Sequence, residues 1–209
     1  AISITFDDGT INHFRVARPL LNERDLPGTF YIVTGGIPGS EEGGKFVGRP
    51  VEEIIEETAH DTTDADNFFE RASAVRYLGY EGTYEYHMEA GALYEQGNVQ
   101  EAYDVIDEGY RKVREGEHEK KDGSWDYPLS EYMYAVMAVE PGVDLVTWDG
   151  LQSYDTDFHE FGSHTITHPY LAVMDEKNIR YELRESREVI RKHLGTEHTF
   201  SAEAPFGTK

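Results

Sequence analysis

The sequence predicts an α/β protein built on a parallel sheet. Two short apolar runs with a helical pattern between them support this prediction. Residues 2–6 (ISITF) and 28–33 (GTFYIV) are rich in β-branched and aromatic side chains, as buried strands are. Residues 13–26 between them carry apolar side chains at helical spacing, although Pro19 disfavours a helix interior. Strand, helix and strand in succession form the unit of a parallel sheet.

The first predicted strand ends in an unusual pair of acids, Asp7 and Asp8, followed by Gly9. Asp-Gly is a favourable turn sequence, so a solvated turn is the simplest interpretation of this triplet alone. Two adjacent carboxylates repel each other unless a positive charge lies beside them or one is protonated. A bound cation is the alternative that the rest of the chain has to support.

The middle of the chain, residues 40–143, is predicted to be an acidic and mostly helical insertion. It holds 25 acidic and 9 basic residues, against a net charge of −22 for the whole chain. Helical patterns occupy residues 50–58, 64–78, 83–96 and 98–115. The last two, joined at Gly97, resemble a single tetratricopeptide-type hairpin. One such unit cannot bury a core alone, so we expect a helical hairpin and not a repeat array.

The last part of the chain, from about Asp144, returns to the α/β pattern. Residues 175–194 form the clearest predicted helix, with Asp175 as its N-cap and Gly195 as its C-terminal stop. Its apolar positions on one face are Ile179, Leu183, Ile190 and Leu194. A final strand and turn are expected within residues 198–207.

Composition narrows the classes of function. A net charge of −22 makes nucleic acid an improbable partner, because a polyanion would be repelled. The absence of cysteine excludes disulfides, thiolate metal sites and a cysteine nucleophile. The sequence contains no run of 18 apolar residues, so no membrane span is expected, and no signal peptide is visible. The sequence leaves the oligomeric state open.

His164 and His168 have a spacing that suits a divalent metal. On one helical turn, or on a turn that mimics it, both imidazoles face the same point. Taken alone, the pair is also compatible with ordinary surface or core histidines. A metal site needs further ligands, and the acidic pair at Asp7 and Asp8 supplies a carboxylate. A cation there would neutralise one acid and leave the other free as a base.

These motifs together resemble a known family. TFDDG, followed by HTITHPYL, is similar to the polysaccharide deacetylases of carbohydrate esterase family four, the NodB homology domain. The segments PGTFYIVTG, HEFGSHTITH and APFG extend the resemblance. It covers residues 1–39 and 144–209, which are therefore expected to form the catalytic domain around the insertion at 40–143.

The resemblance implies a role for each matching residue. Asp7 would be the general base, and Asp8, His164 and His168 would hold a divalent metal, with zinc expected. Pro205 and Phe206 would line the substrate site, and the Phe206 N–H would help to stabilise an oxyanion. The implied fold is a distorted (β/α) barrel with its site at the carboxyl ends of the strands.

Two departures from the family pattern accompany the resemblance. Glu203 stands where many relatives carry an arginine that contacts the catalytic aspartate. The chain ends at Lys209, before the further strands and the late histidine that serves as general acid in the family. The barrel is therefore expected to be incomplete at the C-terminus, and the general acid is left unassigned.

The function implied is that of a metal-dependent hydrolase that removes acetyl groups from an N- or O-acetylated polysaccharide. The expected partner is such a polysaccharide or oligosaccharide, and an extracellular or cell-envelope location is expected from the family. Two alternatives stay open. One is a related hydrolase of non-sugar C–N bonds, and the other is a non-catalytic carbohydrate-binding pseudoenzyme.

Overall fold

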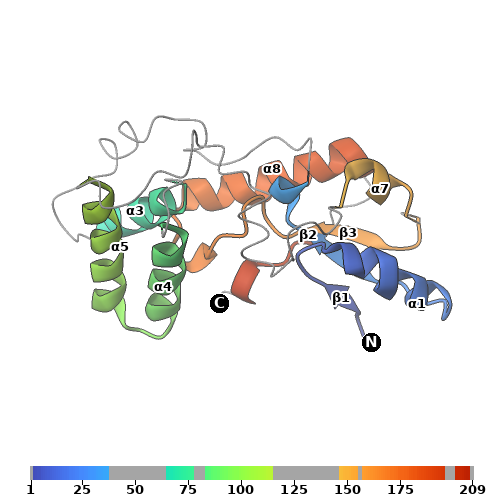
Figure 1. Cartoon of the computed structure of the whole chain (residues 1–209), viewed down its shortest axis with the longest axis horizontal. Coiled ribbons are helices and arrows are strands. Elements are labelled where there is room, and N and C mark those ends of the chain that lie inside the picture. Colours follow the sequence, from blue (N-terminus) through green and yellow to red (C-terminus); the bar gives the residue numbers. More distant parts are fainter. Residues whose placement is uncertain are drawn as a thin grey trace. The chain divides into compact units, whose positions relative to one another are not determined.

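The computed structural model describes residues 2–37, 65–77, 83–114, 146–154, 157–195 and 201–207. They belong to two units, which are described separately (Figure 1). The sheet unit comprises Ala1–Gly43, Leu129–His168 and Glu182–Ala204. The helical unit comprises Gly44–Pro128, Pro169–Tyr181 and Pro205–Lys209. The division into a catalytic domain and an insertion at 40–143 stays a prediction.

A parallel sheet of three strands organises the described part of the sheet unit. Its strands are β1 (Thr5–Phe6), β2 (Thr29–Ile32) and β3 (Glu160–Ser163), in the order β1-β2-β3. The parallel pairing of β1 with β2 confirms the predicted strand–helix–strand unit. Strand β1 is shorter than predicted, since only two residues pair with β2. The mixture of helices and parallel sheet agrees with the α/β class, while the distorted, incomplete (β/α) barrel stays a prediction.

The helix between β1 and β2 forms despite Pro19, because its geometry changes just before that residue. A π-helical turn, η1 (His13–Ala17), leads into α1 (Arg18–Asn22). The Arg18 N–H donates to the carbonyl of His13, five residues earlier. The Arg18 side chain donates to the Phe14 carbonyl at 3.3 Å. In this π-helical pattern the N–H of residue 19 would donate to the Phe14 carbonyl; proline has no N–H, and the Arg18 side chain supplies a bond to that carbonyl instead.

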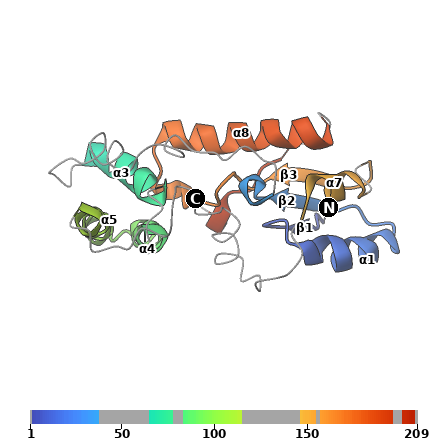
Figure 2. The same ribbon diagram turned by 45° about the horizontal axis from the view of Figure 1, so that its top comes forward.

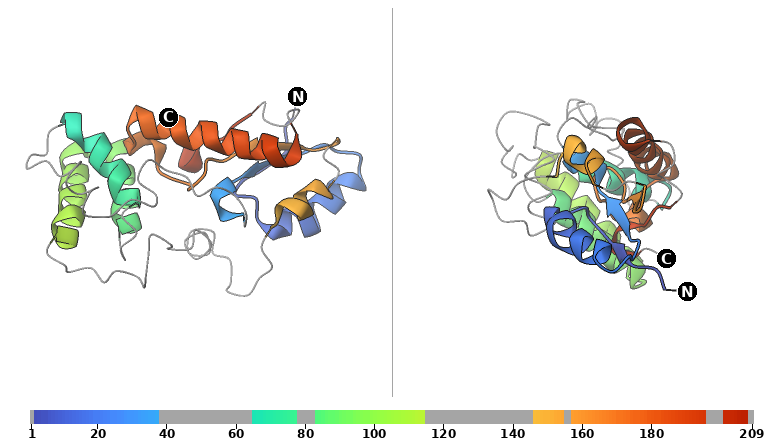
Figure 3. Two further views of the ribbon diagram at one scale, coloured as in Figure 1. Left: turned by 90° about the horizontal axis from the view of Figure 1, so that it is seen from above. Right: turned by 90° about the vertical axis from the view of Figure 1, so that its right-hand side faces the viewer.

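The core of the sheet unit is largely aromatic. Phe14, Phe30 and Phe161 are fully buried, and their ring centroids lie 5.1 to 6.1 Å apart. The part of helix α8 (Glu176–Leu194) that belongs to the sheet unit, from Glu182 on, lies along one face of the sheet and α1 along the other (Figures 2 and 3). A short helix, α7 (Trp148–Gln152), stacks Trp148 on His193 of α8. This packing fixes the strands whose ends carry the candidate site.

Both predicted ends of α8 are confirmed. The Asp175 carboxylate accepts the N–H of Asn178 at 3.2 Å, and Gly195 has a φ of +110°. The buried face differs from the one predicted, because Ile179 and Leu183 are only partly buried. The fully buried side chains in its first four turns are Asn178, Glu182, Ser186 and Ile190. Three of these four are polar, which apolar periodicity does not reveal.

The helical unit confirms three predicted helices. They are α3 (Ala65–Tyr77), α4 (Thr83–Glu95) and α5 (Val99–Arg114), and α4 and α5 form the predicted hairpin through Gly97. The described part of this unit also contains two short 3-10 turns, η3 (Leu171–Val173) and η4 (Pro205–Gly207). The helix predicted at 50–58 lies outside the described residues. Among the described helices, none is long and apolar enough to cross a membrane.

A fully buried histidine, His87, connects three segments of the helical unit. Its Nδ1 lies 2.9 Å from the carbonyl of Ala72, and its Nε2 lies 2.8 Å from the N–H of Tyr170. A carbonyl only accepts and an N–H only donates, so Nδ1 carries the proton of the neutral ring. Burial, together with the positive charge of Arg76, lowers the pKa of His87 to about 3.

Candidate metal centre

The site lies where the parallel strands of the sheet unit end. Asp7 and Asp8 follow β1, and His164 follows β3. Glu203 follows Ala202, which forms an isolated parallel bridge with Ser163. The carboxyl ends of parallel strands lie at one edge of a sheet, so residues distant in sequence meet there. This explains how an aspartate near the N-terminus reaches histidines near residue 165.

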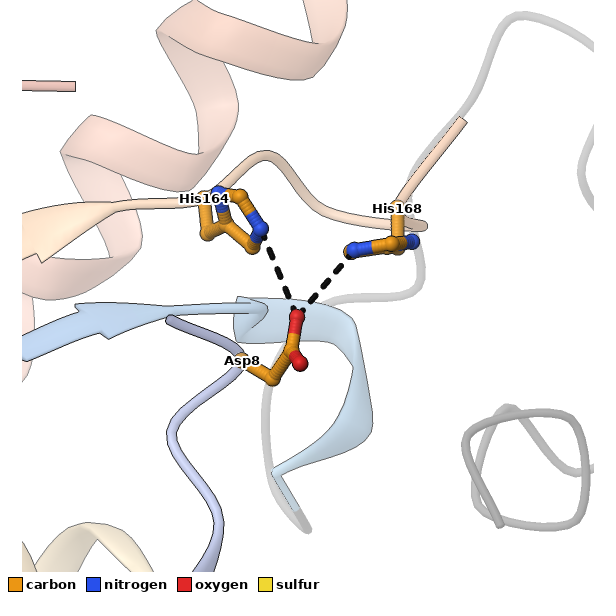
Figure 4. Close-up of side chains that lie close together, drawn as sticks. All are labelled: Asp8, His164 and His168. Atoms are coloured by element: carbon orange, nitrogen blue, oxygen red, sulfur yellow. Dashed lines mark ion pairs between the residues drawn. The ribbon is translucent and has the colours of Figure 1, made fainter. Parts of the chain in front are cut away.

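Asp8, His164 and His168 form one cluster, as the sequence predicted (Figure 4). Asp8 Oδ1 lies 3.4 Å from His164 Nε2 and 3.1 Å from His168 Nε2. All three ligand atoms lie within 4.8 Å of one another. Tetrahedral zinc with bonds near 2.0 to 2.1 Å sets its ligands about 3.3 Å apart. The donor types and their spacing therefore fit a divalent cation, with at least one coordination position left for water or substrate.

The turn after β1 requires unusual backbone angles. Asp8 and Gly9 both have a φ of +70°. Aspartate tolerates this left-handed conformation better than most residues, and glycine adopts it without cost. A Cβ on Gly9 would also come within 3.3 Å of the Ile32 side chain on β2. The sequence Asp-Gly thus supplies both a candidate ligand and the turn that presents it.

The two histidines lie on a tight loop and not on a helical turn. Thr165 and His168 have φ values of +68° and +54°. The Thr165 hydroxyl donates to the His164 carbonyl and accepts the His168 N–H. The end of β2 also holds the loop, because the Thr34 N–H donates to the Thr165 carbonyl at 3.1 Å. These bonds stabilise the loop that carries both histidines.

The cluster shifts the pKa values of its members. Burial alone would raise the pKa of Asp8, but hydrogen bonds and positive charge from His164 and His168 hold it well below its usual range. Burial alone would lower the pKa of His164, yet the bonds to Asp8 and Glu203 raise it. Asp8 is therefore ionised in the metal-free protein, which is the state that a metal ligand requires.

Glu203 lies on the other side of His164. Its carbonyl oxygen is 2.9 Å and its carboxylate 3.1 Å from His164 Nδ1, which directs Nε2 toward Asp8. A carbonyl or carboxylate on the second nitrogen is the usual support of a metal-bound histidine. Burial raises the pKa of Glu203, His164 opposes the shift, and the negative charges of Asp7 and Asp8 add to it. The sequence marked Glu203 only as a departure from the family.

The remaining predicted site residues lie outside the three-residue cluster. Asp7 is exposed, and its charge acts on the pKa of Glu203 and of His13. Pro205 and Phe206 belong to the helical unit, where Phe206 has a φ of +62° and stacks on Tyr170 with ring centroids 5.0 Å apart. The roles of Asp7, Pro205 and Phe206 stay predictions.

Sequence reasoning missed one buried carboxylate beside the histidine loop. Glu182 of α8 is fully buried and accepts three hydrogen bonds from Ile166 and Thr167. The sequence offers no signal for it, because charged residues on a helix are usually solvated and the burial of Ser186 one turn later is known only from the structure.

Comparison with known families decides the identity of the domain. The family model described as polysaccharide deacetylase matches residues 96–209, which include both histidines. The chain belongs to the polysaccharide deacetylase family. Its family supports a hydrolase, and a polysaccharide is the substrate class that the domain implies. The match begins inside the segment predicted as an insertion, and Asp7 and Asp8 precede it. No curated protein and no solved structure is significantly similar to this chain.

Proposed function

We propose that this polysaccharide deacetylase is a metal-dependent hydrolase that removes acetyl groups from an N- or O-acetylated polysaccharide. One observation carries the proposal: an aspartate and two histidines from distant parts of a polysaccharide deacetylase chain meet with the spacing of metal ligands. The strong negative charge of the chain also favours a neutral or cationic polymer over a polyanion.

Asp8, His164 and His168 are the proposed ligands, and zinc is the proposed metal. Two imidazoles and one carboxylate are a known zinc donor set, although the same set also binds iron. A divalent cation bound there supplies the polarisation of the acetyl carbonyl and lowers the pKa of a water toward about 7. Glu203 orients His164 from behind, so that Nε2 and not Nδ1 serves as the ligand atom.

The other residues have roles in moving protons and holding charge. Asp7, exposed at the end of β1, takes a proton from the attacking water. The N–H of Phe206 donates to the oxygen that becomes negative when the acetyl carbonyl is attacked. The group that protonates the leaving amine or alcohol has no assignment among the described residues. By the family's pattern, the protein acts outside the cell or in the cell envelope.

The test measures acetate release by metal-stripped and zinc-loaded protein. The substrates are acetylated chitooligosaccharides, acetylated xylan and small amides, which separate sugar from non-sugar substrates. Zinc should restore activity to the stripped protein. His164→Gln should reduce the activity by roughly 100-fold or more. Loss of a metal ligand should have a larger effect than loss of a residue that only hydrogen-bonds to a ligand. His193→Gln, which changes a histidine at the end of α8, is the matched control and should stay active.

Two results would contradict the proposal. Acetate release that survives in His164→Gln would show that this histidine is not a ligand. Sugar binding by the zinc-loaded protein without release of acetate from any substrate would favour the pseudoenzyme alternative.

A further inference from the structure

Glu182 is a fully buried carboxylate that bonds to the loop carrying the two histidines. Its Oε2 accepts the backbone N–H of Ile166 at 2.8 Å and that of Thr167 at 2.9 Å. Its Oε1 accepts the Thr167 hydroxyl at 2.6 Å. Ile166 and Thr167 are two of the three residues between His164 and His168. The carboxylate is therefore bonded to the centre of the candidate metal-binding loop.

Burying the Glu182 carboxylate costs free energy, which its hydrogen bonds have to offset. A carboxylate removed from water is unfavourable unless hydrogen bonds compensate it, and here charge-assisted bonds do so. The loop has a corresponding need, because two consecutive buried N–H groups require acceptors. Neither N–H can pair within a helix or a sheet, since Thr165 and His168 on either side have positive φ values. Glu182 satisfies both groups with a single oxygen atom.

The loop is attached to α8 at a second point one turn further on. The Ser163 hydroxyl donates to the hydroxyl of Ser186 at 2.8 Å and accepts the N–H of Thr165 at 3.2 Å. Glu182 and Ser186 are both fully buried and four residues apart, so they lie on the same face of the helix. Of the two, only Glu182 bonds directly to the residues between the histidines.

We propose that Glu182 is a positioning residue that holds the loop at 164–168 in the strained conformation in which both imidazoles face Asp8. This proposal rests on the proposed metal centre. It goes beyond that centre because Glu182 would touch neither the metal nor the substrate. Its role would be to set the preorganisation of the ligands, and hence the affinity of the centre for a divalent cation.

The test compares variants of Glu182 by their affinity for Co²⁺, whose visible absorption also reports ligand geometry. Glu182→Met has similar length but no acceptor, so it should weaken Co²⁺ binding by about 10- to 100-fold. Glu182→Gln can still accept the two N–H groups and donate to Thr167, so it should restore affinity to within a few-fold of wild type. Thr167→Val removes one of the three bonds from the loop side and should have an intermediate effect.

Glu160→Met is the matched control. Glu160 is a partly buried carboxylate of the sheet unit, and it accepts hydrogen bonds from the hydroxyls of Thr29 and Ser201. This variant should lose stability to urea without losing affinity for Co²⁺. A Glu182→Met variant that also loses only stability would overturn the positioning role. If Glu182→Met does not fold, an unchanged Co²⁺ affinity in Thr167→Val would overturn it instead.

The outcome for the wild-type protein separates this proposal from the metal centre itself. Wild-type protein that binds no Co²⁺ would overturn the proposed centre, and the role of Glu182 with it. If wild-type protein binds Co²⁺ through Asp8 and Glu182→Met binds it equally well, only the inference about Glu182 would be overturned.

Discussion

Asp8 combines two demands that few residues satisfy together. Its backbone is left-handed, with a φ of +70°, and its carboxylate lies between two imidazoles. Of the short polar residues that tolerate this conformation, aspartate is the one that brings a negative charge. One residue thus has to provide both the carboxylate of the candidate site and the left-handed turn. A substitution that tests the carboxylate must therefore preserve the turn.

Asp8→Asn makes that separation. Asparagine tolerates a positive φ, so the turn should survive, while the loss of the charge should weaken metal binding by at least tenfold and reduce acetate release in parallel. Isothermal titration with Zn²⁺ and an acetate assay measure the two effects. Asp25→Asn is the matched control, because Asp25 also has a positive φ, +54°, but is exposed and lies outside the cluster.

Equal Zn²⁺ affinity in Asp8→Asn and wild type would contradict this prediction. Loss of affinity in both variants would instead point to a general effect of replacing aspartate in left-handed turns.

The three proposed ligands were predictable from sequence, and the residues that support them were not. Asp8, His164 and His168 have the residue types and order of a family motif, so their meeting could be expected. Glu203 and Glu182 have no local signature, because their contacts depend on how distant strands and α8 pack. Their side chains looked like two of the 41 acidic residues of a strongly charged chain.

At the scale of elements, the periodicity of apolar residues predicted where helices form better than it predicted which helix face is buried. The four longest described helices, α3, α4, α5 and α8, all form close to their predicted limits. For α8 the predicted apolar face was only partly correct, because the loop's need for acceptors places Glu182 and Ser186 in the interior. The π-helical turn before Pro19 also escaped prediction, since the sequence shows the proline but not how the neighbouring bonds adjust.

The α4–α5 hairpin allows a test of one turn residue. Gly97 has a φ of +85°, and no atom lies within 4 Å of the position that a Cβ would take. Gly97→Ala should therefore cost only the backbone strain of a left-handed alanine, about 1 kcal/mol in the free energy of unfolding. Gly97→Asn should cost less, because asparagine visits this conformation more readily. Urea denaturation followed by circular dichroism measures both.

Gly91→Ala provides a contrast in the same hairpin. A Cβ on Gly91 would approach the Tyr170 ring to 2.4 Å, so the penalty there would come from overlap. A Gly97→Ala variant as damaged as Gly91→Ala would show that strain alone does not account for Gly97.

At the scale of the whole molecule, the two units have different electrostatic character. The sheet unit places ionised groups around a candidate cation site, where pairing stabilises the charge. The helical unit instead keeps His87 neutral in its interior, between Ala72 and Tyr170. The family match at 96–209 includes residues of both units, so each unit contributes to the matched region.

His87 should make the helical unit sensitive to acid. Its pKa is about 3 when folded and 6.5 in its ordinary state. Above pH 6.5 His87 is neutral in both the folded and the unfolded protein, so it does not make the free energy of unfolding depend on pH. Between pH 6.5 and 3 only the unfolded chain binds the proton, so the free energy of unfolding should fall by about 1.4 kcal/mol per pH unit. Hydrogen exchange of the Tyr170 amide, which donates to His87, measures this loss locally.

The imidazole resonances of His87 provide the direct check. They should not titrate between pH 7.5 and 5 in the folded protein, whereas exposed histidines should. A midpoint for His87 near 6.5 would contradict the buried, neutral state, and the acid sensitivity would then need another origin.

The described backbone has positive φ at five residues other than glycine: Asp8, Asp25, Thr165, His168 and Phe206. All except Asp25 lie in the motifs proposed to form the active site, and each such bend costs free energy in the folded state. Glycine would relieve the bend but would also remove the side chain that the bend presents, such as the Asp8 carboxylate or the Thr165 hydroxyl. Selection for thermal stability alone would therefore accept glycine at position 8 only where the relieved strain exceeds the lost bonds, and the candidate metal centre would be lost with it.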